Sequence, residues 1–254
     1  MRDRRSDVRR VGTGRVSGLC GAVAFLTRVP VGRASADVDM ARSVPFVPIV
    51  GSLVGFAIAG SYIGVGVLLP RLPAAALAVT VGIALTGALH EDGLADTADA
   101  LGARNRVDVL RIMRDPTHGT YGVLALVASF ALRVSAVTSF SRPTALTMLP
   151  VAHALSRTAA LAIVATGPPL ATDGLGATYG LAIRGRPLAV SIGISIVVAA
   201  ALLHLGALAA VAVTVVLGVA VRYLLVTRLG GANGDVAGAC QQVLEIALLL
   251  LASA

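Results

Sequence analysis

Seven apolar stretches, each close to the length of a transmembrane helix, constrain the fold of this chain more than any other feature of its sequence. They run from Val44 to Leu69, Pro73 to Leu89, Thr120 to Phe140, Thr144 to Thr166, Pro187 to Leu203, Leu205 to Val226 and Val236 to Ala254. A helix needs about 20 apolar residues to cross the hydrocarbon core, where it satisfies its own backbone polar groups. The stretches lack the alternating polar pattern of outer-membrane barrel strands. The sequence therefore predicts an all-α, polytopic membrane bundle of about seven transmembrane helices.

The rest of the composition fits this class. Of the 254 residues, 56% are hydrophobic and only 13% charged, whereas about a quarter of a soluble domain is charged. The stretch from Val16 to Val29 is short and interrupted by Arg28, so we expect an N-terminal interfacial or re-entrant helix. Residues 1–15 are predicted to form a disordered basic tail that meets anionic lipid rather than nucleic acid, and residues 16–254 one integral-membrane domain.

Arginine placement predicts the orientation, because short cytoplasmic loops of membrane proteins are enriched in Lys and Arg. With the N-terminus inside, the cytoplasmic segments would hold 16 arginines and the outer loops only two, Arg71 and Arg142. The expected cytoplasmic segments are 1–43, 91–119, 167–186 and 227–235.

The segment "HEDGLADTADALG", His90 to Gly102, concentrates acidic residues behind the second apolar stretch. On a helix, the spacing places Asp92, Asp96 and Asp99 on one face, with Glu91 at its edge. Like charges at this spacing destabilise a helix unless a cation lies between them. Oxygen donors without cysteine suit Mg²⁺, which completes its shell with water and substrate phosphate. The alternative is a solvated helix face whose charges pair with Arg104, Arg106 and Arg111.

The next segment, "RIMRDPTHGTYG", places Arg111 and Arg114 before a turn that contains Gly119 and opens the third apolar stretch. Guanidinium groups and the backbone amides at such a helix start could bind phosphate oxygens. A basic juxtamembrane loop that only sets topology is the alternative. His118 in this turn could serve as a base or simply face solvent.

Polar residues late in the chain indicate a polar centre inside the bundle. In "GGANGDVAG", Asp235 is expected at a helix N-cap, where Asp is among the favoured residues. Glu245 lies within the last apolar helix and Arg157 within "HALSRTAAL", both at positions where a charge facing lipid is costly. We therefore expect Glu245 to face the bundle interior near Asp235 or Arg157, and Arg157 to pair with a carboxylate or a phosphate.

In this order, the motifs "FLTRVPVG", "VPFVPIVGSLVG", "LHEDGLADTADALG", "IMRDPTHGTYGVLAL", "LSR" and "GGANGDVAGA" resemble the cobalamin synthase family of adenosylcobinamide-GDP ribazoletransferases. The resemblance covers about Phe25 to Glu245 and is most specific at "DGLADTAD". It implies transfer of adenosylcobinamide phosphate from adenosylcobinamide-GDP to α-ribazole or its 5′-phosphate, with release of GMP. It also implies a Mg²⁺ requirement and a location in the cytoplasmic (inner) membrane, with the active site facing the cytoplasm.

The family's acidic motif falls on Glu91, Asp92, Asp96 and Asp99, and its late Gly-Asp element on Gly234 and Asp235. These motifs, the helical spacing of the acids and the arginines near them predict three groups of site residues. The catalytic residues are Asp92, Asp96 and Glu91; the metal ligands are Asp92, Asp96, Asp99 and Asp235; the substrate-binding residues are Arg111, Arg114, Gly119, Arg157 and Gly234. Which acid accepts the acceptor's proton stays open, as does the presence of a homo-oligomer.

Three other functions are alternatives to a ribazoletransferase. A CDP-alcohol phosphotransferase would continue its acidic motif as DGxxAR and later GxxxDxxxD, whereas Ala95 is followed here by Asp96 and Thr97. A cation-coupled transporter commonly shows repeated halves, but the acidic motif has no second copy. A non-catalytic membrane scaffold would leave the carboxylates unexplained.

Overall fold

The structure, a computed structural model, describes residues 15–31, 39–170, 180 and 183–253 of the chain. Regular structure in these ranges is helical, apart from an isolated bridge between Pro169 and Ala232. The elements are α1 (Arg15–Leu26), α2 (Met40–Ser43), the 3-10 turn η2 (Val44–Phe46), α3 (Val47–Val65), α4 (Arg71–Thr86), α5 (Leu89–Ala100), α6 (Arg106–Ile112), α7 (Thr120–Ser139), α8 (Arg142–Thr166), α10 (Arg186–Leu203), α11 (Gly206–Leu229) and α12 (Gly234–Leu251).

The predicted class of fold is confirmed. Within the described residues, six helices are long and apolar enough to cross a membrane, or seven if the bent pair α4 and α5 is one span. The helices begin and end within a few residues of the predicted spans, and α1 occupies the predicted short N-terminal segment. Of the predicted basic tail, only Arg15, at the start of α1, lies among the described residues.

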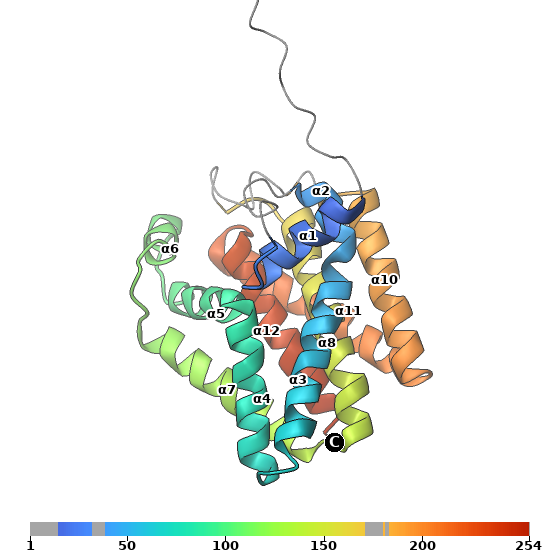
Figure 1. The fold of residues 1–254 in the computed structure, drawn as a ribbon. Coiled ribbons are helices and arrows are strands. Elements are labelled where there is room, and N and C mark those ends of the chain that lie inside the picture. The colour runs from blue at the N-terminus through green and yellow to red at the C-terminus, as the bar shows by residue number, and fades with distance from the viewer. Residues whose placement is uncertain (1–14, 32–38, 171–179, 181–182, 254) are drawn as a thin grey trace, which may run out of the picture.

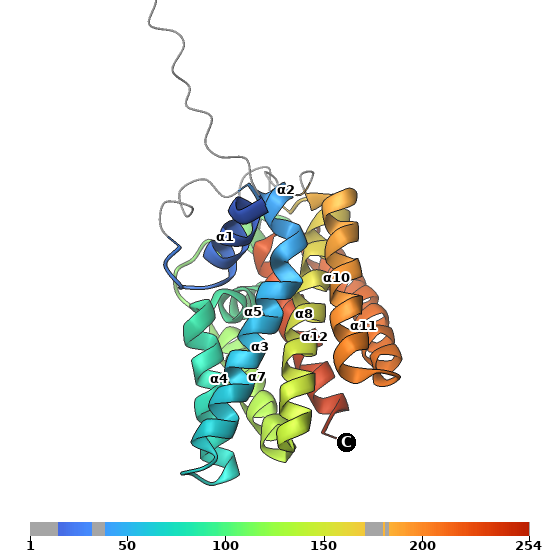
Figure 2. The ribbon, with the colours of Figure 1, turned by 45° about the vertical axis from the view of Figure 1, so that its right-hand side comes forward.

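Helix α8 occupies the centre of the bundle. In Figures 1 and 2, α3 and α12 lie beside α8, while α10 and α11 form an outer layer. The membrane-spanning window of α8 is 83% buried, against 17% for those of α10 and α11. Polar residues are tolerated in α8 because its side chains contact other helices rather than lipid.

A sharp bend after α4 turns α5 away from the direction of the spanning helices. The two helices meet at 91°, and the corner residues Gly87 and Ala88 both have left-handed backbone conformations. The side chain of Arg28 lies where a Cβ on Gly87 would be, and the left-handed backbone at Gly87 also favours glycine. The backbone N–H of Arg28 also donates to the carbonyl of Leu85, at 2.8 Å. Helix α5 therefore runs sideways from the upper end of α4 instead of continuing the span (Figure 1).

Two glycines let α5 lie directly against the first turns of α12. A Cβ on Gly93 would fall 2.8 Å from the carbonyl oxygen of Asp235 and 2.9 Å from its Cα. A Cβ on Gly238 would meet the backbone of His90 at 3.3 Å. This backbone contact brings the acidic face of α5 beside Asp235.

Charged residues meet in the interior, beneath α5. The guanidinium of Arg133 on α7 lies 2.9 Å from Glu91 and 3.6 Å from Glu245, and that of Arg157 on α8 lies 3.4 Å from Glu245. All four side chains are buried. The expectation that Glu245 faces the bundle interior near Arg157 is confirmed. Two guanidinium groups face two carboxylates, so the charges of these residues balance without lipid contact.

Neutral polar side chains complete this buried network. Gln241 donates to Glu245 at 2.6 Å, Gln242 donates to Glu91 at 3.3 Å, and Ser129 donates to Gln242 at 2.9 Å. Among the described residues, a few buried polar atoms of the network have no partner, including Oε2 of Glu91 and Nε of Arg157. The network joins α5, α7, α8 and α12 at one level.

Replacing Glu245 should destabilise the bundle. Glu245→Leu would leave Arg133 and Arg157 short of a buried countercharge, at a cost of about 3 to 5 kcal/mol, whereas Glu245→Gln keeps hydrogen-bonding capacity and should cost less. Thermal unfolding of the purified protein in detergent measures the difference. Val243→Leu, at a half-exposed position of the same helix, is the control. A Glu245→Leu variant as stable as the unmodified protein would contradict the role of this ion network.

Candidate active site

The acidic residues of α5 face a histidine of the loop between α6 and α7. His118 lies 3.7 Å from Asp92 through Nε2 and 3.4 Å from Asp96 through Nδ1. The sequence left His118 open between a base and a solvent-facing loop residue, and the structure places it on the acidic face. Arg104, Arg106 and Arg111 were the alternative partners; Arg106 instead donates to the carbonyls of Pro169 and Leu170.

A third carboxylate, that of Asp235, comes to this face from α12. Burial, together with the nearby charges of Asp235 and Asp92, raises the pKa of Asp96 to about 6. Two predicted metal ligands of α5 and the predicted ligand of the late loop are therefore neighbours. Carboxylates this close repel one another, which favours binding of a cation between them.

The start of α12 corrects one prediction. Asn233, not Asp235, is the N-cap, and its side chain accepts a hydrogen bond from the backbone N–H of Val236 at 3.0 Å. Asn and Asp are about equally good caps, so the sequence did not distinguish them. The helix begins at Gly234, and Asp235 lies in its first turn with a hydrogen bond from Asn233 at 2.8 Å. Because Asn233 caps the helix, the carboxylate of Asp235 is directed to the acidic face.

Asp99 makes contacts of a different kind. One of its carboxylate oxygens accepts from the backbone N–H of Gly119 at 2.7 Å, and the other from that of Gly122 at 2.9 Å. These bonds satisfy amides at the start of α7, which lacks a side-chain cap from its own N-cap residue. The metal role of Asp99 and the substrate role of Gly119 stay predictions. The contacts observed here fasten the loop to α5.

Hydrogen bonds between its own residues hold the loop between α6 and α7. Both the backbone N–H and the hydroxyl of Thr117 donate to Asp115, at 2.9 and 2.6 Å, and these bonds lower the pKa of that carboxyl.

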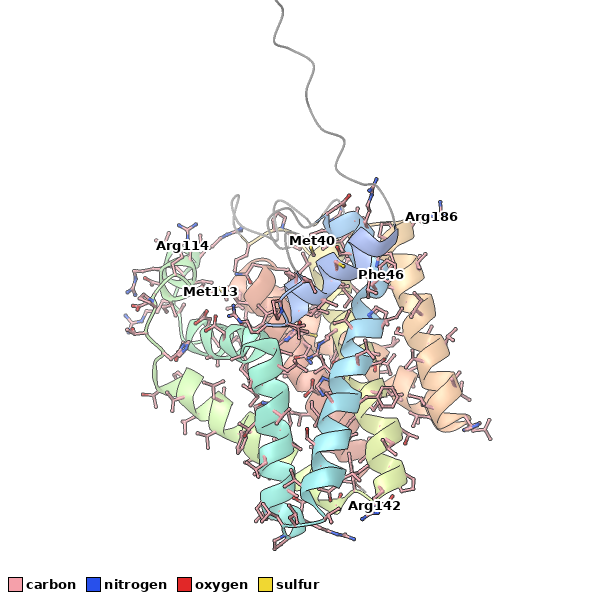
Figure 3. The ribbon with its side chains drawn as sticks, in the orientation of Figure 1. Met40, Phe46, Met113, Arg114, Arg142 and Arg186 are labelled. Carbon is pink, nitrogen blue, oxygen red and sulfur yellow. The ribbon has the colours of Figure 1, made fainter. Side chains whose placement is uncertain are left out.

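Arg111 lies on α6 and pairs with Asp108 at 3.6 Å rather than with the acids of α5. Arg114 lies at the α6 side of the molecule (Figure 3). The substrate roles of both arginines stay predictions.

A cavity of about 160 Å³ opens beside the acidic face, between α1, α5, α8 and α12. Asp92, Asp235, Gly234 and Arg157 all line it. Four residues that the sequence marked separately for metal or substrate are thus brought to one space. Glu91 does not line this cavity but belongs to the buried network with Arg133. Its predicted catalytic role stays a prediction.

The carboxylates at this face suit a Mg²⁺ ion that the protein does not coordinate alone. Within the described residues, no group of three or more His, Cys, Asp or Glu side chains is arranged to hold a metal by itself. Mg²⁺ commonly needs only one or two carboxylates and completes its octahedral shell with water and phosphate oxygens. One or two of the carboxylates Asp92, Asp96 and Asp235 would therefore be enough for an ion that the protein and a phosphate-bearing substrate hold together.

Comparison with known proteins identifies relatives along nearly the whole chain. The family model for cobalamin-5-phosphate synthase matches residues 18–253. The chain is 41% identical to the adenosylcobinamide-GDP ribazoletransferase of Bradyrhizobium diazoefficiens, with 92% of each chain covered. It is 38% identical to that of Pseudomonas aeruginosa, with 90% of this chain and 94% of the relative covered, and 36% identical to that of Chlorobaculum tepidum, with 94% and 95% covered.

No solved structure matches the chain. The resemblance deduced from the motifs is confirmed by the sequence relatives, which do not support the phosphotransferase, transporter or scaffold alternatives. The acidic face of α5, the cavity beside it and the match over residues 18–253 lead to one assignment: the chain belongs to the cobalamin-5-phosphate synthase family.

Proposed function

We propose that this chain joins adenosylcobinamide phosphate to α-ribazole or its 5′-phosphate at the cavity lined by Asp92, Asp235 and Arg157. Membership of the family makes the chain an adenosylcobinamide-GDP ribazoletransferase of cobalamin biosynthesis. The single observation that supports the site is the meeting of carboxylates from α5 and α12 with a buried arginine of α8 around one space. A phosphoryl group needs that combination of metal-binding and cationic groups.

The reaction forms a bond between the acceptor's hydroxyl oxygen and the phosphorus that bears the cobinamide, and it breaks the bond from that phosphorus to the GMP oxygen. When bound by Asp92, Asp96 and Asp235, Mg²⁺ would neutralise the charge of the diphosphate. Arg157 would hold a phosphate oxygen through its guanidinium and orient the group for in-line attack. His118, which contacts Asp92 and Asp96, or one of these carboxylates would accept the hydroxyl proton.

The active site is proposed to face the cytoplasm. Figure 3 shows Arg114 and Arg186 at the end of the bundle that carries α1, and Arg142 at the opposite end. Arg114 and Arg186, from two of the arginine-rich segments, therefore share one end of the bundle, as the enrichment of arginine on the cytoplasmic side would require.

Removing the metal-binding carboxylates should abolish catalysis without unfolding the protein. Asp92→Asn and Asp96→Asn should each lower turnover about 100-fold or more, because charge neutralisation at the diphosphate is lost. Transfer from adenosylcobinamide-GDP to α-ribazole, followed across a Mg²⁺ titration, measures the effect. A second readout is the rise in thermal stability caused by Mg²⁺ in the presence of adenosylcobinamide-GDP, which these variants should lose.

Asp108→Asn is the matched control, since Asp108 lies on α6 and pairs with Arg111. It should keep normal turnover and a normal Mg²⁺ titration. If Asp92→Asn and Asp96→Asn also kept both, the acidic face would be a solvated surface and the proposed site would be wrong.

Labelling from outside the cell tests the orientation. In a background without Cys20 and Cys240, a cysteine at Val107 on α6 should resist an impermeant thiol reagent in intact cells. A cysteine at Leu205, between α10 and α11, should react. Both positions are exposed, at 76% and 85%, so after permeabilisation both should react. Labelling at position 107 in intact cells would reverse the proposed orientation.

A further inference from the structure

The cavity beside the acidic face has two chemically different parts. The polar part holds Asp92, Asp235, Arg157 and His90. Most of the remaining wall is apolar and is formed by Phe25 and Leu26 of α1, Met40 of α2, Leu161 and Val164 of α8, and Ile183. Met40 is seen beside α1 in Figure 3. A ligand that fills this space must carry an apolar portion next to its reacting group.

The size of the cavity limits what that portion can be. Pockets that enclose whole drug-sized ligands occupy roughly 300 to 1,000 Å³, whereas this one occupies about 160 Å³. A corrin ring with its amide side chains is far too large to enter. A flat, two-ring base is of suitable size. The apolar part therefore fits one end of a substrate rather than the whole corrinoid.

The apolar wall of the cavity also favours the base of ribazole over guanine. Guanine presents a carbonyl, a ring N–H and an amino group, each of which would lose hydrogen bonds to water in an apolar space. The base of ribazole is a benzimidazole with two methyl groups, and its outer edge carries no polar atom. Phe25, Leu26, Leu161 and Val164 offer contacts for such an edge and no hydrogen bonds from their side chains.

We propose that this apolar part of the cavity binds the dimethylbenzimidazole base of the acceptor and so selects the acceptor nucleoside. With the base between α1 and α8, the ribose extends toward Asp92 and Asp235, where a ribose hydroxyl other than the 5′ one meets the activated phosphoryl group. The inference rests on the proposed function, because it assigns one substrate of that reaction to one part of the same site. The acceptor's phosphorylation state does not alter it.

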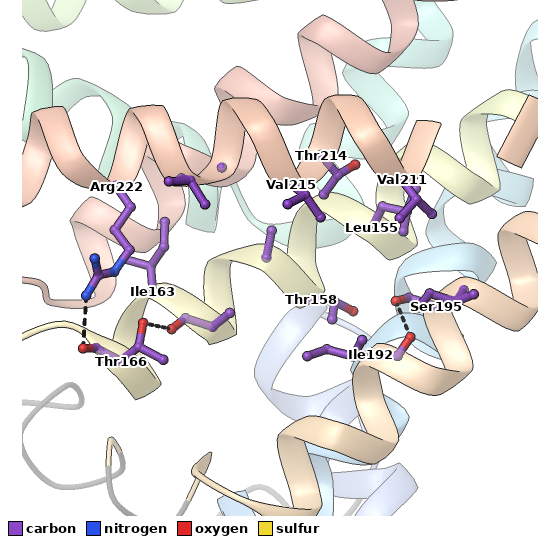
Figure 4. A pocket seen from close by; sticks show the side chains of 15 residues that line it. Leu155, Thr158, Ile163, Thr166, Ile192, Ser195, Val211, Thr214, Val215 and Arg222 are labelled. Carbon is purple, nitrogen blue, oxygen red and sulfur yellow. Dashed lines mark hydrogen bonds between the residues drawn. The ribbon is translucent and has the colours of Figure 1, made fainter. Parts of the chain in front are cut away.

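A second cavity, on the other face of α8, provides a comparison. It occupies about 290 Å³ between α8, α10 and α11, and Figure 4 shows Thr158, Ile192 and Val215 around it. Its lining is also mainly apolar but includes no Asp or Glu. A base bound there would be separated by α8 from the acidic face. The two cavities therefore allow the same substitution to be compared on opposite faces of one helix.

Ala160→Leu narrows the proposed base site, and Ala162→Leu places the same side chain in the second cavity. For Ala160→Leu, the KM for α-ribazole should rise about tenfold or more, while the KM for adenosylcobinamide-GDP stays within a factor of two. Ala162→Leu should leave both KM values unchanged. The Ala160→Leu enzyme should also lose less activity with benzimidazole riboside, which lacks the two methyl groups, than with α-ribazole.

Several results would overturn the inference. They are a rise in the KM for adenosylcobinamide-GDP alone, equal effects of the two substitutions, or unchanged discrimination between the two ribosides. If the unmodified protein did not transfer to α-ribazole at all, the proposed function itself would fail, which is a distinct outcome.

A second variant covers the case in which Ala160→Leu does not fold. Val164→Ala enlarges the same wall and should improve kcat/KM for a riboside with a bulkier base, such as naphthimidazole, relative to α-ribazole. Ala159→Gly, on the second cavity, is its control. No change in this preference would also contradict the assignment.

Discussion

The contact between α5 and α12 is the constraint on which the rest of the site depends. Gly93 and Gly238 let two backbones touch, so no side chain separates the acidic face of α5 from the first turn of α12. Asp92 and Asp235 become neighbours only because of this approach. Larger residues at either glycine would push the two helices apart and would move Asp235 away from the acidic face of α5.

The buried ion network connects this contact with the centre of the bundle. Glu91 pairs with Arg133 inside the protein, while the next residue, Asp92, points to the cavity. Arg157 takes part in both places, since it contacts Glu245 and lines the cavity. Charges that would be costly in lipid are retained because each has a partner, and they fix the orientation of α5 as a result.

Hydropathy alone located the spans, because bilayer thickness sets the length of any helix that crosses it. Helical periodicity likewise placed Asp92 and Asp96 on one face. No local sequence pattern predicts contacts between distant segments. The pairing of Arg133 with Glu91 depends on how α7 packs against α5. The position of His118 beside the acids depends on a loop that is folded around Asp115. Arg111 lies on α6, a helix within the segment 91–119 that was predicted only as a cytoplasmic segment. The sequence thus predicted elements and residue types better than side-chain partners.

Helix α1 differs from the other walls of the cavity because it is too short to span a membrane. It supplies Phe25 and Leu26 to the apolar part, and the chain just after it is held at the Gly87 corner by Arg28. Most of the remaining wall belongs to the bundle or to α5, whose positions are set by the buried ions and the glycine contacts. Substitutions in α1 would therefore reshape the apolar part of the cavity while leaving the buried ion network intact.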